Sequence, residues 1–211
     1  MAKLRINCFT ISLDGFGAGP DQTRNEPLGV GGESLHEWMF VTEAWKDRNA
    51  GTTPADNFLR RGFDNVGAWI MGRNMFGPIR GDWPDEAWRG WWGRNPPYHC
   101  PTYVLTHYPR KPIEMEGGTV FHFVTDGIES AYRQAMAAAG GKDVRLGGGA
   151  SVIRQYLEAG LVDQMHIAIA PILLGRGEAP FAGVDLLALG FQPTEVVPTP
   201  LATHYVLTRK S

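Results

Sequence analysis

Three successive glycines, Gly147, Gly148 and Gly149, stand between an apolar segment that ends at Leu146 and an amphipathic segment that follows. Because glycine has no Cβ, such a turn lets a ligand come close to the main chain. Ser151 is placed to cap the following helix, and the unpaired N–H groups of a helix start attract phosphate. The turn therefore indicates a nucleotide or another phosphorylated ligand. A tight strand-to-helix connection without a ligand is the alternative.

Two further strand ends carry side chains suited to phosphate. The apolar segment 66–71 runs into Gly72 and Arg73, and a later apolar segment ends in Thr106 and His107. Arginine offers a rigid fork of donors that matches a phosphate group, and α/β folds bind ligands at the carboxyl ends of their strands. We expect the three strand ends to form one site, although a surface arginine in a turn is the simpler explanation of Arg73 alone.

The elements that must position these residues alternate between strand and helix. Central strands are predicted where both faces are apolar, and helices where apolar residues recur with helical spacing. The predicted strands are 5–13, 66–71, 102–106, 120–124, 144–146 and 165–172, and the predicted helices are 35–45 (capped by Ser34), 128–139 and 151–159. Two antiparallel strands, 194–197 and 203–208, complete the chain. The pattern predicts an α/β fold with a central, mostly parallel mixed sheet, antiparallel C-terminal strands and flanking helices.

Two stretches do not fit this alternation. Residues 15–32 are rich in glycine and predict a long mobile loop. Residues 78–101 form an insertion rich in Trp and Pro, in which Asp85 is placed to cap a short helix. The insertion contains four of the seven tryptophans: Trp83, Trp88, Trp91 and Trp92. It predicts a satellite hydrophobic cluster, a wall of a ligand pocket or a dimer contact.

Composition limits the classes of protein to consider. The chain has 211 residues, of which 43% are hydrophobic and 20% charged, and predicts one domain over 1–211. A formal net charge of −2 gives no reason to expect nucleic acid or an anionic membrane as a partner. No apolar run approaches the roughly 20 residues that span a bilayer, and the N-terminus lacks a signal peptide's apolar segment. Two cysteines are too few for a disulfide framework, and the histidines show no metal-ligand spacing. We expect a cytoplasmic protein without a metal.

The motifs resemble those of the dihydrofolate reductase-like superfamily. They are most similar to the reductase domain of bifunctional riboflavin-biosynthesis proteins (the RibD C-terminal domain) and its stand-alone relatives. The matching segments occur in the family's order and span most of the chain: 12–15, 71–76, 105–107, 147–149, 161–163 and 171–177. The resemblance implies a three-layer fold, with a mostly parallel sheet between helices, and NADPH as the reductant.

The resemblance also implies a role for each motif. Arg73, after Gly72 and with Asn74 nearby, would hold the 2′-phosphate of NADPH, and Thr106 and His107 would flank this phosphate and the adenosine. The pyrophosphate would lie on the glycine turn and the helix start: Gly147, Gly148, Gly149, Ala150, Ser151 and Val152. In the family, two of these glycines are often joined by a cis peptide bond. Residues 12–17 would lie along the nicotinamide.

The implied reaction is hydride transfer to a small heterocyclic, carbonyl or imine substrate. A proton must also be delivered, and Asp14 is the first candidate and Glu37 the second. A turn at Asp14 and a solvated helix face at Glu37 are the structural alternatives. Asp14 and Trp38 are the predicted substrate contacts. A substrate of the riboflavin pathway carries a phosphate, for which Arg24 and Arg176 are available.

Several identities remain open within this resemblance. An activity like that of 5-amino-6-(5-phosphoribosylamino)uracil reductase is the most specific expectation. The alternatives are a dihydrofolate or pterin reductase, and a non-catalytic NADP-binding protein that uses its Trp-rich segment for a partner. By analogy with the family, we also expect a homodimer.

Overall fold

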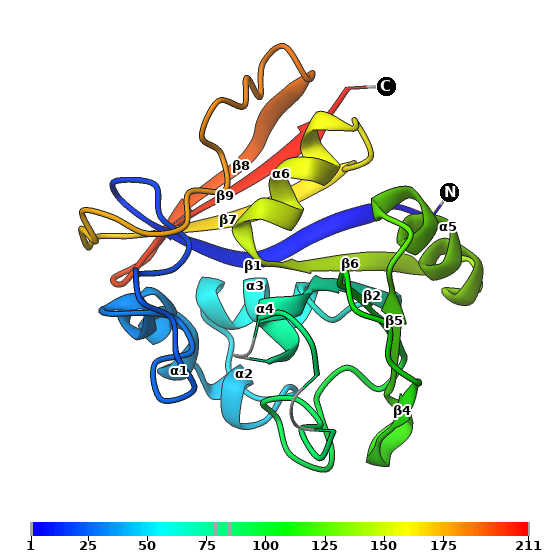
Figure 1. Cartoon of the computed structure of the whole chain (residues 1–211). Coiled ribbons are helices and arrows are strands. Elements are labelled where there is room, and N and C mark those ends of the chain that lie inside the picture. Colours follow the sequence, from blue (N-terminus) through cyan, green and yellow to red (C-terminus); the bar gives the residue numbers. More distant parts are fainter. Residues whose placement is uncertain (1, 78–79, 84–85, 211) are drawn as a thin grey trace.

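The computed structural model describes residues 2–77, 80–83 and 86–210, and within them the chain forms one nine-stranded sheet. Figure 1 shows the sheet running from β4 (Ile113–Glu114) at one edge to β8 (Phe191–Pro198) at the other. In spatial order the strands are β4 (Ile113–Glu114), β5 (Val120–Val124), β3 (Pro101–Leu105), β2 (Val66–Gly72), β6 (Asp143–Gly148), β1 (Leu4–Ser12), β7 (Gln164–Ala170), β9 (Thr203–Arg209) and β8 (Phe191–Pro198).

The central strands are parallel and both edges are antiparallel. From β5 through β3, β2, β6 and β1 to β7, each strand pairs in parallel with its neighbour. The antiparallel strands are β4 at one edge and β9 with β8 at the other. The predicted mixed sheet is therefore confirmed. The short edge strand β4 was not predicted, because two residues carry no periodic signal.

Helices cover both faces of the sheet, which gives three layers. One face packs against α5 (Ile128–Ala138) and α6 (Ala150–Glu158) around the largest hydrophobic cluster. The other packs against α1 (Glu37–Phe40), α2 (Glu43–Lys46), α3 (Pro54–Arg61), α4 (Arg73–Phe76) and the insertion. In β2, Ala68 and Ile70 face the first layer, whereas Trp69 and Met71 face the second. No helix of the described residues is long and apolar enough to cross a membrane.

The predicted helix over 35–45 is wrong as a single helix. A 3₁₀ turn (Gly32–His36), α1 and α2 share this stretch, and Ser34 makes no side-chain cap. The helical conformation is interrupted at Thr42, whose backbone is extended. The hydroxyl of Thr42 caps α2 by accepting from the N–H of Trp45 at 3.1 Å. Helix α3 was missed, although Thr53 and Asp56 form a capping box around Pro54.

Backbone hydrogen bonds hold the glycine-rich loop 15–32 in a compact conformation. The N–H of Gly17 donates to the carbonyl of Glu178 at 2.8 Å, and the N–H of Glu178 donates to Ala18 at 3.0 Å. A methyl group at Gly19 would lie 2.1 Å from the carbonyl oxygen of Val30. The glycines thus allow close backbone packing, and the predicted mobile loop is a compact one.

The insertion packs as a hydrophobic cluster on the second face. Trp83 and Trp88 contact a buried group that includes Phe76 and Phe121. The indole N–H of Trp88 donates to the carbonyl of Phe76 at 3.0 Å. This arrangement matches the satellite-cluster prediction. The helix cap proposed at Asp85 lies outside the described residues.

A chain of oriented hydrogen bonds crosses the core between β1 and the β8–β9 turn. At a bulge in β1, Cys8 has a positive φ of 53°, and its N–H donates to Nδ1 of His166 at 3.2 Å. This leaves the His166 proton on Nε2, which donates to Nδ1 of His204 at 3.0 Å. Nε2 of His204 then donates to the hydroxyl of Thr199 at 3.2 Å. Phe58 stacks on both rings, and both imidazoles are buried.

We expect the protein to lose stability as the pH falls below neutrality. Burial lowers the pKa of His204 to about 4 and that of His166 well below its usual value. In the unfolded chain both take up a proton near pH ~6.5, so acid favours unfolding. The free energy of unfolding should therefore be highest above that pH. It should fall toward pH 4 by up to about 1.4 kcal/mol per pH unit for each histidine.

Urea unfolding at several pH values measures this dependence. His204→Gln, whose amide does not titrate, should show a shallower pH dependence than the wild-type chain. An unchanged slope would mean that His204 is not one of the groups responsible.

Candidate nucleotide-binding site

Parallel pairing brings the carboxyl ends of four strands to one edge of the sheet. The order β3, β2, β6, β1 places Leu105, Gly72, Gly148 and Ser12 at neighbouring strand ends. The motifs after β2 and β6 are in contact, since a methyl group at Gly72 would lie 2.8 Å from Cγ2 of Val152. Three of the predicted motifs therefore meet at this edge, where parallel sheets bind their ligands.

The three glycines of the turn differ in the structural reason for having no side chain. A Cβ on Gly147 would lie 2.9 Å from Cε of Met75, and one on Gly148 would lie 3.2 Å from Cε2 of Phe9. Gly148 also has a φ of 129°, which favours glycine. No atom lies within 4 Å of a Cβ on Gly149. The chain's own packing thus explains the first two glycines, whereas Gly149 presents bare backbone to open space.

Helix α6 begins directly at this open position. Its N-cap is Gly149, and Ser151 lies within the first turn, so the predicted Ser151 cap is wrong. The N–H of Val152 donates to the carbonyl of Gly149 at 3.1 Å. In the described part of the chain, the N–H groups of Ala150 and Ser151 donate to no acceptor. The bond between Gly148 and Gly149 is a cis peptide, as the resemblance implies.

Arg73 and Thr106 meet across the ends of β2 and β3. Nη1 of Arg73 donates to the hydroxyl of Thr106 at 3.2 Å, and that hydroxyl accepts from the N–H of Tyr108 at 3.2 Å. Asn74 and His107 are exposed beside this pair. Burial, and then the charge of Arg110, lower the pKa of Arg73 to about 10, so its guanidinium is cationic at neutral pH. The strand ends thus offer a second point of attraction for an anion.

Trp83 of the insertion lies on the guanidinium of Arg73, a contact that the sequence did not reveal. The ring centroid is 3.1 Å from Cζ of Arg73. Arg73 also donates to the carbonyls of Gly81 and Asp82, at 3.2 and 3.5 Å. The insertion therefore reaches the candidate site, which is where the pocket-wall alternative would place it.

Asp14 joins two loops at the carboxyl edge. Its carboxylate accepts from the hydroxyl of Ser12 at 2.5 Å and from the N–H groups of Leu174 and Gly175 at 3.1 and 2.6 Å. The hydrogen bond from Ser12 and those from the backbone lower the pKa of Asp14. A general acid at neutral pH needs a raised pKa, so this geometry suits an anchor. The catalytic role of Asp14 stays a prediction.

The other predicted substrate residues are divided between core and surface. Trp38 is 1% exposed, and its indole N–H donates to the hydroxyl of Thr10 at 2.9 Å, so it serves here as a core residue rather than a surface contact. Glu37 is exposed, as its structural alternative predicts. Arg176 pairs with Asp21 at 3.5 Å, and Arg24 lies over the Trp88 ring.

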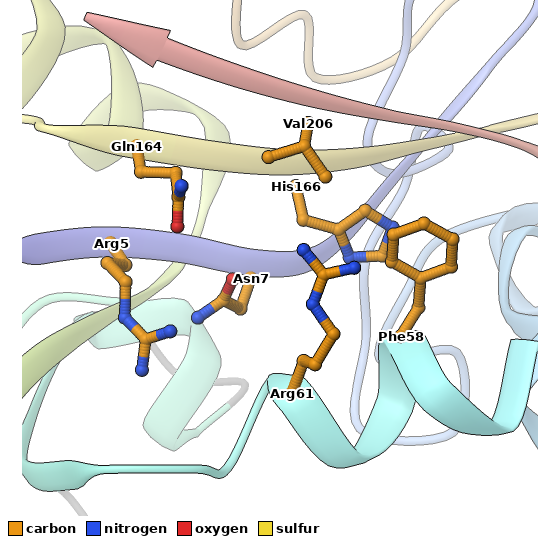
Figure 2. A pocket seen from close by; sticks show the side chains of 7 residues that line it. All are labelled: Arg5, Asn7, Phe58, Arg61, Gln164, His166 and Val206. Atoms are coloured by element: carbon orange, nitrogen blue, oxygen red, sulfur yellow. The ribbon is translucent and has the colours of Figure 1, made fainter. Parts of the chain in front are cut away.

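A hollow of about 20 Å³ lies away from this edge, in the layer of α3. Figure 2 shows its lining residues: Arg5 and Asn7 of β1, Phe58 and Arg61 of α3, Gln164 and His166 of β7, and Val206 of β9. This volume holds about one water molecule, so the hollow cannot receive a nucleotide. Among the described residues, no group of three or more His, Cys, Asp or Glu side chains could hold a metal ion.

Comparison with known proteins identifies relatives over the whole chain. The family model described as RibD C-terminal domain matches residues 3–204. The uncharacterized protein YyaP of Bacillus subtilis is 46% identical over 44 residues, which span 21% of this chain and 23% of YyaP.

Solved structures share the fold at low sequence identity. A putative riboflavin biosynthesis protein from Shewanella sp. PV-4 has a TM-score of 0.58 at 20% identity, with all of both chains covered. A diaminohydroxyphosphoribosylaminopyrimidine deaminase/5-amino-6-(5-phosphoribosylamino)uracil reductase from Thermotoga maritima has 0.59 at 12% identity, over 99% of this chain and 57% of that one. Enterococcus faecalis dihydrofolate reductase, complexed with NADP(H), has 0.52 at 15% identity, over 99% of this chain and 97% of that one.

Substitution of neighbouring glycines should separate packing from ligand access. We expect Gly148→Ala to destabilise the fold by about 1–3 kcal/mol, because alanine is strained at this φ and contacts Phe9. Gly149→Ala should change the free energy of unfolding by less than about 1 kcal/mol, since its Cβ enters open space. Urea unfolding of both variants measures the difference. Equal losses would show that Gly149 is also required for packing.

Proposed function

The chain belongs to the RibD C-terminal domain family, and we propose that it is an NADPH-dependent reductase that transfers hydride to a small heterocyclic or carbonyl substrate. The observation that carries the proposal is the meeting of two anion-attracting points at one sheet edge. One is Arg73 with Thr106, and the other is Gly149 with the start of α6. A dinucleotide that carries a third phosphate offers a pyrophosphate and a 2′-phosphate to two such points.

The residues present fit NADPH. Arg73 would hold the 2′-phosphate with Thr106, while Asn74 and His107 lie exposed beside them for the adenosine. The open backbone of Gly149 and the N–H groups of Ala150 and Ser151 would receive the pyrophosphate. An arginine fork matches a phosphate, whereas recognition of the NADH ribose uses an acidic residue. The Enterococcus dihydrofolate reductase structure, complexed with NADP(H), supports this choice of cofactor.

The chain would contribute orientation and exclusion of water to the reaction, and the cofactor would supply the hydride. Phe9 and Met75 both pack against the glycine turn and help to hold its backbone in place. Asp14 fixes the loop after β1 to the loop after β7 through Leu174 and Gly175. Because its carboxylate stays ionised, we assign the proton to water or to another group, with Glu37 as the side-chain candidate.

For the substrate, we propose a phosphorylated ribosylaminopyrimidine. The Thermotoga structure, which bears the name of 5-amino-6-(5-phosphoribosylamino)uracil reductase, supports this class, and this chain spans 57% of that protein. Arg24 is an exposed residue of the loop 15–32, and the exposed Arg176 pairs with Asp21 of the same loop. Either guanidinium is suited to the substrate phosphate.

The second candidate class is a non-catalytic NADP-binding protein with a partner. Trp92 is 49% exposed and its ring lies 6.3 Å from that of Trp45, so two large apolar side chains meet at the surface. Exposed aromatic residues of this kind favour contact with another protein. A pterin reductase is the other enzymatic alternative. We also propose that the protein is a homodimer and that it is located in the cytoplasm.

Turnover tests the proposed function directly. Purified protein should oxidise NADPH when mixed with the ribosylaminopyrimidine phosphate. The decrease in the absorbance of the reduced nicotinamide measures the rate. Oxidation only with dihydropterins would favour the pterin reductase. Tight binding of NADPH without turnover across pyrimidine, pterin and carbonyl acceptors would favour the non-catalytic protein.

Arg73→Ala should weaken NADPH binding far more than NADH binding. The loss of charge-assisted hydrogen bonds to the 2′-phosphate predicts a dissociation constant about tenfold to a hundredfold higher for NADPH, with that for NADH nearly unchanged. Calorimetric titration with both cofactors measures the two constants. Arg133→Ala, on the exposed face of α5, is the matched control. If the affinities for NADPH and NADH fall equally, Arg73 does not bind the 2′-phosphate.

A further inference from the structure

Two guanidinium groups face a single indole at the edge of the candidate site. Cζ of Arg73 is 3.1 Å from the Trp83 ring centroid, and Cζ of Arg110 is 4.7 Å from it. Arg73 follows β2, Arg110 lies in the segment after β3, and Trp83 belongs to the insertion. Three segments far apart in the sequence therefore place two positive charges beside one ring.

The Trp83 indole is held by one hydrogen bond and by two aromatic contacts. Its N–H donates to the carbonyl of Tyr108 at 3.0 Å. Its ring makes edge contacts with Phe76 and Phe123, at centroid distances of 5.9 and 5.0 Å. Trp83 is thus a fixed platform on which a guanidinium can stack.

Arg110 is likewise oriented by the backbone of the insertion. Its Nη2 donates to the carbonyl of Glu86 at 2.5 Å and to that of Trp88 at 2.9 Å. These contacts fix the position of the guanidinium and of its charge. Arg110 therefore contributes a preorganised cation near Arg73, at no further cost in side-chain entropy when an anion arrives.

Two like charges in a half-buried site repel each other. After burial, the charge of Arg110 is the largest influence that lowers the pKa of Arg73. Within the described residues Arg73 donates to carbonyl and hydroxyl oxygens and to no carboxylate. Asp82 is the nearby acid, and its Oδ1 accepts the N–H of Trp83 at 2.8 Å. A doubly charged anion bound between the arginines would replace repulsion by attraction.

Resting on the proposed function, we propose that Arg110 and Trp83 complete the 2′-phosphate site, so that the insertion determines the preference for NADPH over NADH. In this arrangement Arg73 and Arg110 both bind the phosphate, and Trp83 fixes the positions of their guanidinium groups. The carbonyls of Gly81 and Asp82 occupy the Nη atoms of Arg73 until phosphate oxygens, as stronger acceptors, take their place.

Fragments of the cofactor test the site without any redox chemistry. 2′,5′-ADP and 5′-AMP differ by the 2′-phosphate, and calorimetry gives the dissociation constant of each. We expect Arg110→Gln to weaken 2′,5′-ADP about tenfold and to leave 5′-AMP unchanged. The glutamine amide can still donate to the insertion's carbonyls, so the fold is kept. Arg89→Gln, an insertion arginine that donates to the carbonyl of Glu114, is the matched control.

Trp83→Leu gives an independent variant, with the same expected loss of selectivity. If Arg73→Ala lowers selectivity for 2′,5′-ADP and Arg110→Gln does not, the further inference is wrong and the proposed function stands. Equal weakening of both fragments by Arg110→Gln would assign it a structural role and overturn the inference. If the wild-type chain prefers neither fragment, the proposed NADPH site and this inference both fail.

Discussion

The parallel pairing of β2 with β6 is the constraint on which the candidate site depends. It puts the ends of both strands side by side, so that Gly72 lies against the start of α6 with no room for a Cβ. A larger residue at Gly72 would push Val152 and the helix start away from Arg73. The distance between the two anion-attracting points is therefore set by the sheet itself, and loop conformation adds little to it.

The two faces of the sheet serve different needs. The layer of α5 and α6 contains the largest hydrophobic cluster. The opposite layer contains buried polar groups, including the imidazoles of His166 and His204 and the guanidinium of Arg145, which donates to the carbonyls of Gly62 and Asn7. Each such group needs partners, so this layer is specified by hydrogen-bond geometry as well as by shape.

The sequence predicted the features that depend on neighbours along the chain. The strand Val120–Val124 and the helix Ile128–Ala138 follow from local apolar spacing, and glycines mark the end of the helix. The break at Thr42 was not predicted, because the same apolar stripe continues across it. Local spacing gave no sign that Asp14 anchors the loop after β7, because its partner Leu174 is 160 residues away.

For the candidate site, the order of the motifs and the parallel sheet sufficed to bring Arg73, Thr106 and the glycine turn to one edge. The contact of Trp83 with Arg73 could not be predicted, since the insertion has no periodic pattern and its position rests on aromatic contacts with distant strands. Whether a tryptophan lies in a core or at a ligand depends on tertiary packing, which composition does not contain.

The route of the insertion has a structural consequence. It connects the carboxyl end of β2 with the amino end of β3, while the register of the two strands is set by their own ladder. Its length can therefore change without altering that register, provided that its aromatic contacts with Phe76 and Phe121 are kept. A change within this crossover would alter what lies against Arg73 while the pairing of β2 with β3 and β6 stays as it is.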